Sequence, residues 1–145
     1  MLSNTSKYAI RAIIYLALNA KDQSKIGIKQ ISKELNIPMP FLGKILQSLA
    51  KHKILSSTKG PHGGFGFNRS PYEISLMDVV EVIDGIDSFN ECILGLESCS
   101  KDSAHCPIHK NYADIRSQLK NLFDTENIGE LAARIKDSAD NSIIL

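Results

Sequence analysis

Two prolines, Pro38 and Pro40, stand between two short apolar runs and restrict the possible folds more than any other feature. Proline is tolerated only in the first turn of a helix, so NIPMP over 36–40 predicts a tight turn and a new helix. On both sides of the turn apolar residues recur at helical spacing: Ile28, Ile31 and Leu35, then Leu42, Ile45, Leu46 and Leu49. The pattern predicts a helix-turn-helix whose second helix ends near Lys51.

A glycine-rich segment follows this helix pair. Residues 54–59 and 65–70 alternate well enough to be strands, and GPHGG over 60–64 joins them. Glycine allows positive φ and a close approach of the backbone to a groove. A hairpin directly after a helix-turn-helix is typical of a winged helix. We therefore expect a mainly α fold with a small β-hairpin, and a winged helix-turn-helix domain over residues 1–84.

Further helices are expected on both sides of this domain. The first should span about 5–19 with Thr5 or Ser6 near its cap, and a Ser75–Asp78 capping box should open a helix that ends at Gly85. Later apolar residues form a short heptad seam: Ile108, Tyr112, Ile115, Leu119 and Leu122. The seam fits either packing within the chain or a dimer helix. We assign residues 110–145 to dimerisation helices, the last over about 128–137.

The net charge of +1 conceals a strong asymmetry. Residues 1–70 carry eleven Lys or Arg against two acidic residues, whereas residues 71–145 carry six against fourteen. A basic half suggests a polyanionic partner, and together with the predicted winged helix it suggests double-stranded DNA. The candidate DNA-binding residues lie on the helix pair and the hairpin: Lys29, Lys44, Gln47, Lys51, Lys59, Gly60, His62, Gly63, Gly64 and Arg69.

Other classes of protein find little support. The sequence has no run of 18 or more apolar residues, so we expect no membrane span. Arg11 interrupts the apolar stretch near the N-terminus, which favours an amphipathic helix over a secretory signal and hence a cytoplasmic protein. Neither a phosphate-binding glycine motif nor a recognisable nucleophile arrangement is present, so we do not expect an enzyme.

All three cysteines, Cys92, Cys99 and Cys106, fall in one window at intervals of seven residues. Gly95 and Pro107 interrupt any helix there, so residues 85–109 are expected to form a loop. One disulfide would leave a thiol over. An iron–sulfur cluster, a zinc site and a reversible thiol switch are all compatible with this pattern, and six-residue gaps suit a bulky cluster better than zinc. His109 and His105 are candidates for a fourth ligand.

Several stretches resemble the Rrf-type winged-helix regulators, the group that contains IscR, NsrR and CymR. They are SKYAIRAIIYLA, ISKELNIPMPFLGKILQSLAKHKIL, KGPHGGF and the three cysteines ahead of a helix, and the resemblance covers nearly the whole chain. It implies a homodimer that binds palindromic promoter DNA under the control of a 2Fe–2S or 4Fe–4S cluster. Cys92, Cys99 and Cys106 would then be the thiolate ligands.

Some positions match one branch of this group better than another. His109 stands where IscR-like members place a histidine ligand. NsrR-like members use an acidic residue before a tyrosine of the first helix, and this chain has Lys7 before Tyr8. CymR-like members lack the cluster. Both gaps between cysteines are one residue longer than in IscR, and Pro40 and Gly43 replace residues able to bond base edges, so operator preference does not carry over.

Overall fold

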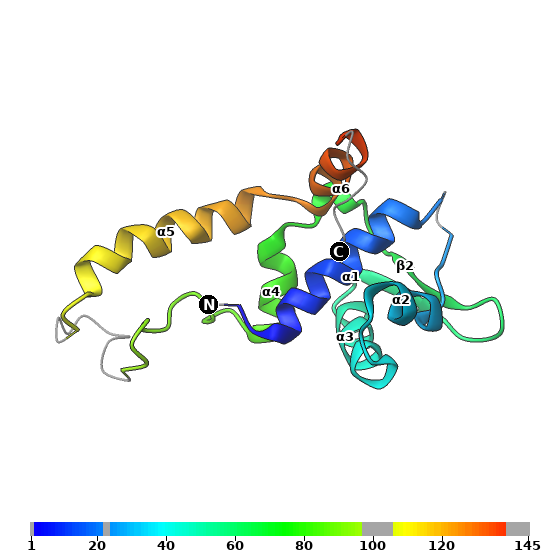
Figure 1. Cartoon of the computed structure of the whole chain (residues 1–145), viewed down its shortest axis with the longest axis horizontal. Helices are drawn as coiled ribbons and strands as arrows, with labels where there is room; N and C mark the ends of the chain where they lie inside the picture. Colours follow the sequence, from blue (N-terminus) through cyan, green and yellow to red (C-terminus); the bar gives the residue numbers. More distant parts are fainter. Residues whose placement is uncertain (1, 22–23, 97–105, 139–145) are drawn as a thin grey trace.

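The computed structural model describes residues 2–21, 24–96 and 106–138. In chain order the elements are α1 (Asn4–Asn19), α2 (Ile28–Leu35), α3 (Met39–Lys51), β1 (Leu55–Thr58), β2 (Gly64–Phe67), the 3-10 helix η1 (Pro71–Glu73), α4 (Leu76–Asp84), α5 (His109–Thr125) and α6 (Ile128–Asp137). Figure 1 shows one body built from α1–α4, α6 and the hairpin, with α5 projecting from it. None of the helices in these ranges is long and apolar enough to cross a membrane.

The helix pair predicted around the two prolines is confirmed. α2 is capped at its C-terminal end by Asn36, whose φ of 52° and ψ of 44° place it in the left-handed region that Asn tolerates. Pro38 is the N-cap residue of α3, and Pro40 lies in its first turn. The apolar stripe of α3 is buried in the main core: Leu42, Ile45, Leu46 and Leu49. The mainly α architecture with a small hairpin is therefore as expected.

The hairpin is anchored to the helix pair. β1 and β2 pair antiparallel, with Leu55 opposite Phe67 and Thr58 opposite Gly64. Phe65 and Ile26 exchange two backbone hydrogen bonds of 2.9 Å, so the segment before α2 lies alongside β2. A Cβ at Gly64 would come within 2.4 Å of the Ile26 carbonyl oxygen, so only glycine fits at this contact. The hairpin is thus held in place at its base.

The start of α1 differs from the prediction. Its N-cap is Ser3, whose hydroxyl accepts a hydrogen bond from the Ser6 amide at 3.0 Å, rather than Thr5 or Ser6. Asp84, the last residue of α4, accepts hydrogen bonds from both the amide and the hydroxyl of Ser3. This carboxylate selects one of three neighbouring hydroxyls as the cap. It also ties the start of α1 to the end of α4.

The final helix returns to the body. Ile128 is fully buried in the main core, and α6 lies against α1 and η1. The junction between α5 and α6 pairs with the segment before α4, because Leu76 donates to the Glu126 carbonyl and Ile128 to the Ile74 carbonyl, each at 2.9 Å. The apolar stripe of α6 is therefore covered within the same chain.

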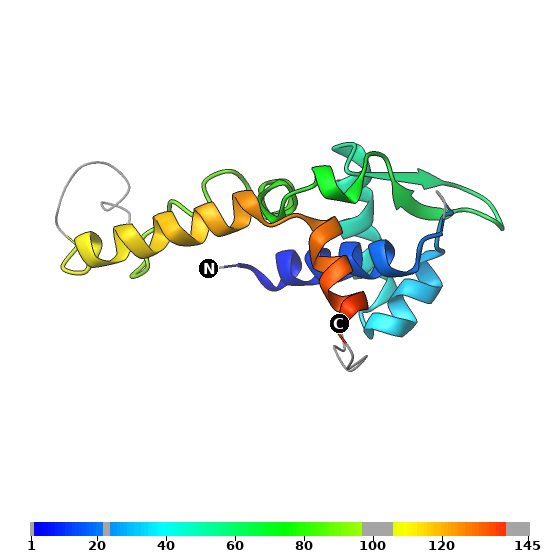
Figure 2. The ribbon, with the colours of Figure 1, turned by 90° about the horizontal axis from the view of Figure 1, so that it is seen from above.

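A second, smaller core connects α4 to the base of α5. It contains Met77 and Val80 of α4, Phe89 of the following loop and Phe123 of α5. The Phe89 and Phe123 rings are tilted at 57° with centroids 5.0 Å apart. Beyond this core α5 runs outward, as Figure 2 shows from above. The first turn of α5 lies at the end of the molecule remote from α3 (Figure 1).

Candidate DNA interface and cysteine site

The outer face of α3 is polar and basic. Pro40, Lys44, Gln47 and Lys51 are exposed and share one stripe, because they are three or four residues apart along the helix. Lys29 on α2 is also exposed. This face has the positive charges that phosphate contacts need and a Gln that is able to bond a base edge.

Gly43 lies at the edge of that face that is nearer to α2. It is half-buried, and a Cβ built there would lie 3.2 Å from Cδ1 of Ile28. Its small size permits close packing of the two helices.

The hairpin tip combines two exposed side chains with three glycines. Lys59 and His62 project at the tip, and Gly60 has a φ of 106° that other residues rarely adopt. A Cβ at Gly63 would come within 2.1 Å of the Thr58 carbonyl oxygen. Gly60, Gly63 and Gly64 thus shape the turn, while Lys59 and His62 supply the groups that could meet a nucleic acid.

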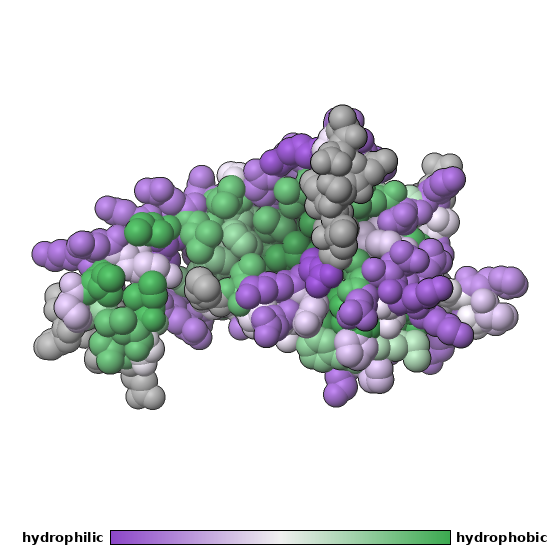
Figure 3. Space-filling model, viewed as in Figure 1, coloured by the Kyte–Doolittle hydropathy of each residue, from purple (hydrophilic) through white to green (hydrophobic). Residues whose placement is uncertain are grey.

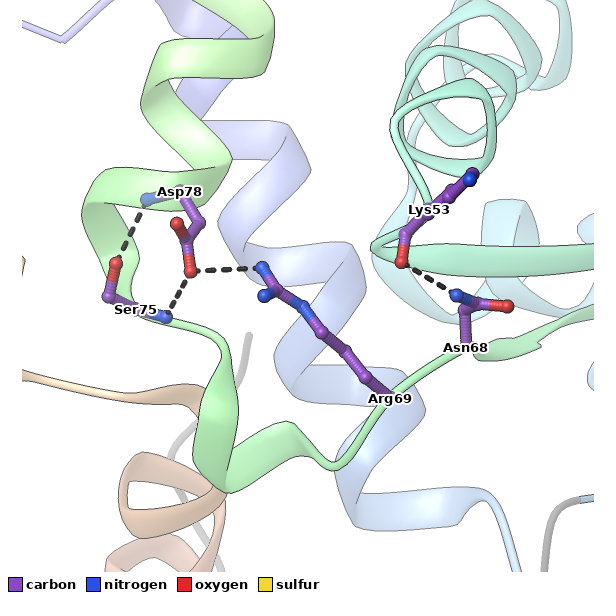
Figure 4. Close-up of polar contacts among 5 residues, drawn as sticks. All are labelled: Lys53, Asn68, Arg69, Ser75 and Asp78. Atoms are coloured by element: carbon purple, nitrogen blue, oxygen red, sulfur yellow. Dashed lines mark hydrogen bonds and ion pairs between the residues drawn. The ribbon is translucent and has the colours of Figure 1, made fainter.

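Arg69 is turned toward α4. Figure 4 shows its guanidinium next to Asp78, with Nη2 3.1 Å from Oδ2 of the carboxylate. Asp78 also accepts the Ser75 amide at 3.0 Å, and Ser75 Oγ accepts the Asp78 amide, which confirms the predicted capping box. In this arrangement Arg69 connects the end of the hairpin to the start of α4.

A small cluster at the start of α3 was not anticipated from the sequence. The Tyr8 and Phe41 rings meet edge to face, with centroids 5.7 Å apart and an interplanar angle of 87°. Arg11 lies 5.7 Å from the Tyr8 centroid and donates to the Leu35 carbonyl at 3.3 Å. The signal available in the sequence was Phe41 itself, an aromatic residue outside the buried stripe of α3.

Two of the three cysteines come together in the described part of the chain. Sγ of Cys92 and Sγ of Cys106 are 3.8 Å apart, although 14 residues separate them. A turn with Gly95 at a φ of 70° follows Cys92, and the Gly95 amide donates to the Cys92 carbonyl at 2.9 Å. The His109 amide donates to the Cys106 carbonyl at 3.1 Å. These turns bring both thiols to the first turn of α5.

The pair of thiols has a separation suited to a shared metal ion. Two thiols joined by a hydrogen bond lie this far apart, as Cys92 and Cys106 do here. Two thiolates bound at about 2.3 Å to one tetrahedral ion would also lie about 3.8 Å apart, whereas disulfide sulfurs are about 2.05 Å apart. His109, Tyr112 and Arg116 line the same small depression as Cys92 and Cys106. Cys99 and His105 lie outside the described residues. Among the described residues, no group of three or more His, Cys, Asp or Glu side chains is placed to hold a metal ion.

Comparison with known proteins identifies the family. A family model described as Rrf2, iron-dependent transcriptional regulator, matches residues 2–134. The chain belongs to the Rrf2 family. Among curated Rrf2-like relatives, a predicted HTH-type transcriptional regulator of Aquifex aeolicus is 33% identical over 132 residues, covering 90% of each chain. The regulator IscR of Aliivibrio salmonicida is 27% identical over 130 residues, which cover 90% of this chain and 76% of IscR.

Solved structures show the same winged-helix fold. CymR, the global cysteine regulator of B. subtilis, superposes with a TM-score of 0.76 at 19% identity, covering 92% of this chain and 97% of CymR. IscR of T. potens superposes with a TM-score of 0.72 at 18% identity, covering 100% of this chain and 93% of IscR. The fold of this chain is therefore shared by CymR and by IscR.

Proposed function

We propose that the protein is a dimeric regulator whose binding to promoter DNA is controlled by an iron–sulfur cluster. Cys92, Cys99 and Cys106 would provide the thiolate ligands and His109 the fourth ligand. The observation that supports this proposal best is the 3.8 Å separation of the Cys92 and Cys106 sulfurs beside the His109 position. A bound cluster would supply a redox-sensitive link between the loop over 85–96 and the start of α5.

The residues around the thiols suit such an anionic group. Cys106 is buried, which limits the access of solvent to a cluster. Arg116, on the next turns of α5, lines the depression and donates to the Asn90 carbonyl at 3.4 Å. A guanidinium at this position offsets the negative charge that thiolates acquire when they bind metal. It also holds the loop against α5.

DNA binding is assigned to the opposite part of the molecule. Lys44, Gln47 and Lys51 would enter the major groove with α3, while Lys29 would contact the phosphate backbone. Lys59 and His62 of the hairpin would lie beside the groove. Gly60, Gly63 and Gly64 would keep the hairpin tip narrow enough for that approach, and Arg69 would hold its base.

Dimerisation is assigned to α5. Ile108, Ile115 and Leu122 are exposed and seven residues apart, so they share one face of the helix. Figure 3 shows hydrophobic surface along α5 and between this helix and the body of the molecule. A second copy that packs its α5 against this face would cover the stripe and present two α3 helices to two half-sites.

A zinc site or a reversible thiol switch in the same loop is the second candidate. The sulfur separation of 3.8 Å suits two ligands of one zinc ion as well as two ligands of one iron ion. The CymR structures with the same fold include an oxidized form of the Staphylococcus aureus protein. Metal content separates the two candidates.

Iron, acid-labile sulfide and zinc per chain, measured on protein purified without oxygen, test the cluster. We expect near-equal iron and sulfide in the native protein and loss of both in Cys106→Ser. His109→Ala and His105→Ala form a matched pair, because only the variant that removes the fourth ligand should alter the visible spectrum. Stoichiometric zinc without sulfide would contradict the cluster and would favour the zinc site.

Promoter binding has its own test. Lys44→Ala should weaken binding to duplex DNA, since a contact to a base edge in the major groove is lost. Lys136→Ala is the control, because it removes the same charge from the distant helix α6. Equal losses in both variants would contradict the assignment of α3 to the groove.

A further inference from the structure

The first turn of α3 presents an apolar surface to solvent. Met39 is 47% exposed and Phe41 37% exposed, and Pro40 between them is also exposed. Leu42 next to them is fully buried. Single exposed apolar residues are common, but here three successive ones begin the helix whose outer face carries Lys44, Gln47 and Lys51.

This turn offers little for hydrogen bonding. Pro38 and Pro40 have no N–H group, and the Phe41 amide donates to the Pro38 carbonyl at 3.1 Å. No side chain from 38 to 43 carries a donor or acceptor other than the weakly accepting sulfur of Met39. The first strong hydrogen-bonding side chain of α3 is Lys44, a full turn farther along the helix.

The Phe41 ring is held in place from outside α3. It meets the Tyr8 ring edge to face at 5.7 Å, and Tyr8 in turn lies against Arg11. Arg11 is fixed at its other end by the Leu35 carbonyl at the end of α2. A ring already positioned loses little conformational entropy when it makes a new contact. The exposed part of Phe41 is therefore a preformed contact surface.

We propose that Met39 and Phe41 recognise the 5-methyl groups of thymines in the major groove. The first residues of a recognition helix contact base edges, and the thymine methyl is the apolar feature that a base pair displays there. Lys44 and Gln47, one turn later, would read neighbouring guanine or adenine edges. This inference rests on the proposed function, because it requires α3 to be the helix that enters the major groove.

The test uses uracil, which differs from thymine only by that methyl group. Duplexes that bind the full chain are first selected from a random pool, and each thymine of the enriched half-site is then replaced by deoxyuridine. We expect a loss of affinity of about fourfold at one or two thymines, as for one buried methyl group. The remaining replacements should change affinity less than about twofold.

Two variants test whether Met39 and Phe41 cause the loss of affinity on deoxyuridine replacement. In Met39→Ala and Phe41→Leu, the penalty of at least one deoxyuridine replacement should disappear, while thermal unfolding checks that each variant is folded. Gln47→Ala is the matched control, since it should weaken binding but keep the deoxyuridine penalty. Two variants are used so that the test can still be completed if one of them does not fold.

Several outcomes overturn the inference. Enriched half-sites without thymine, deoxyuridine effects below about twofold throughout, or a penalty unchanged in both variants would each exclude methyl recognition by this turn. DNA binding itself would survive in those cases. A random pool that yields no enriched sequence would instead contradict the proposed function, so the two failures are distinguishable.

Discussion

Ser6 is a polar residue in the interior of the main body. It is fully buried on α1, and among the described residues its Oγ has no hydrogen-bond partner. Burying a hydroxyl without a partner costs about 1–3 kcal/mol. We expect Ser6→Ala to raise the free energy of unfolding by about 1 kcal/mol, because alanine fills nearly the same space without that cost.

Urea unfolding of the native chain and Ser6→Ala measures this change. Ser117→Ala is a suitable control, because Ser117 is exposed and its hydroxyl already bonds the Ala113 carbonyl at 3.0 Å. Its effect on stability should be below about 0.5 kcal/mol. A lower stability in Ser6→Ala would mean that the buried hydroxyl is bonded after all.

The contact between Arg69 and Asp78 connects two elements, the hairpin and α4. Both side chains are partly exposed, 42% and 37%, so the ion pair itself should contribute no more than about 1 kcal/mol. We expect Arg69→Ala to lower the free energy of unfolding by about 0.5 kcal/mol and to leave the salt dependence of DNA binding nearly unchanged. Lys59→Ala should leave the free energy of unfolding nearly unchanged and reduce the salt dependence of DNA binding, because Lys59 is exposed at the hairpin tip and has no ion-pair partner among the described residues.

Unfolding in urea and binding titrations at several salt concentrations measure both variants. A salt slope that falls equally in Arg69→Ala and Lys59→Ala would show that Arg69 leaves Asp78 and contacts phosphate. That result would support the expectation from the sequence that Arg69 belongs to the DNA-binding set.

Most elements were predictable because their signals are local. The apolar spacing of α3, the prolines before it and the Ser75–Asp78 capping box lie within a few residues of the structure that they specify. Ser3 was missed as the cap of α1 because Asp84, 81 residues away, selects it. The closeness of Gly43 to Ile28 likewise depends on the packing of another helix. Signals that depend on tertiary neighbours are not visible in one stretch of sequence.

The candidate site also had a part that could be predicted from the sequence and a part that could not. Clustering of the cysteines is plain in the sequence, but the closeness of Cys92 to Cys106 depends on the turns around Gly95 and Cys106. The heptad seam predicted the helix α5 correctly. It did not show which seam residues are covered, because Leu119 packs against the small core while Ile115 remains exposed.

The exposed stripe of α5 bears on the assembly of the whole molecule. Ile115 is 60% exposed, so a charge placed there should not disturb the monomer. We expect Ile115→Glu to convert a dimer into a folded monomer and to weaken operator binding more than tenfold, since two linked half-site contacts become one. Light scattering and binding titrations measure this. Asn121→Glu adds the same charge to another exposed face and should leave both properties intact.

The thiols and α3 lie in different parts of the molecule, so control of DNA binding by the thiols needs a physical connection. Within one chain that connection is the small core, where Phe89 follows α4 and Phe123 belongs to α5. α4 in turn packs against α1 and α3. A change in the loop that holds Cys92 would therefore move Phe89, three residues before it, and through Phe89 the end of α4.

Phe89→Leu should weaken that connection while it preserves an apolar core of similar volume. We expect metal and sulfide content to match the native chain, and the difference in operator affinity between metal-loaded and metal-free protein to shrink by about fivefold or more, the lower end of typical allosteric coupling. Phe67→Leu in the hairpin is the control, and it should change both affinities equally. An unchanged difference in Phe89→Leu would exclude the small core as the connection, and would direct attention to the contact between the two α5 helices of a dimer.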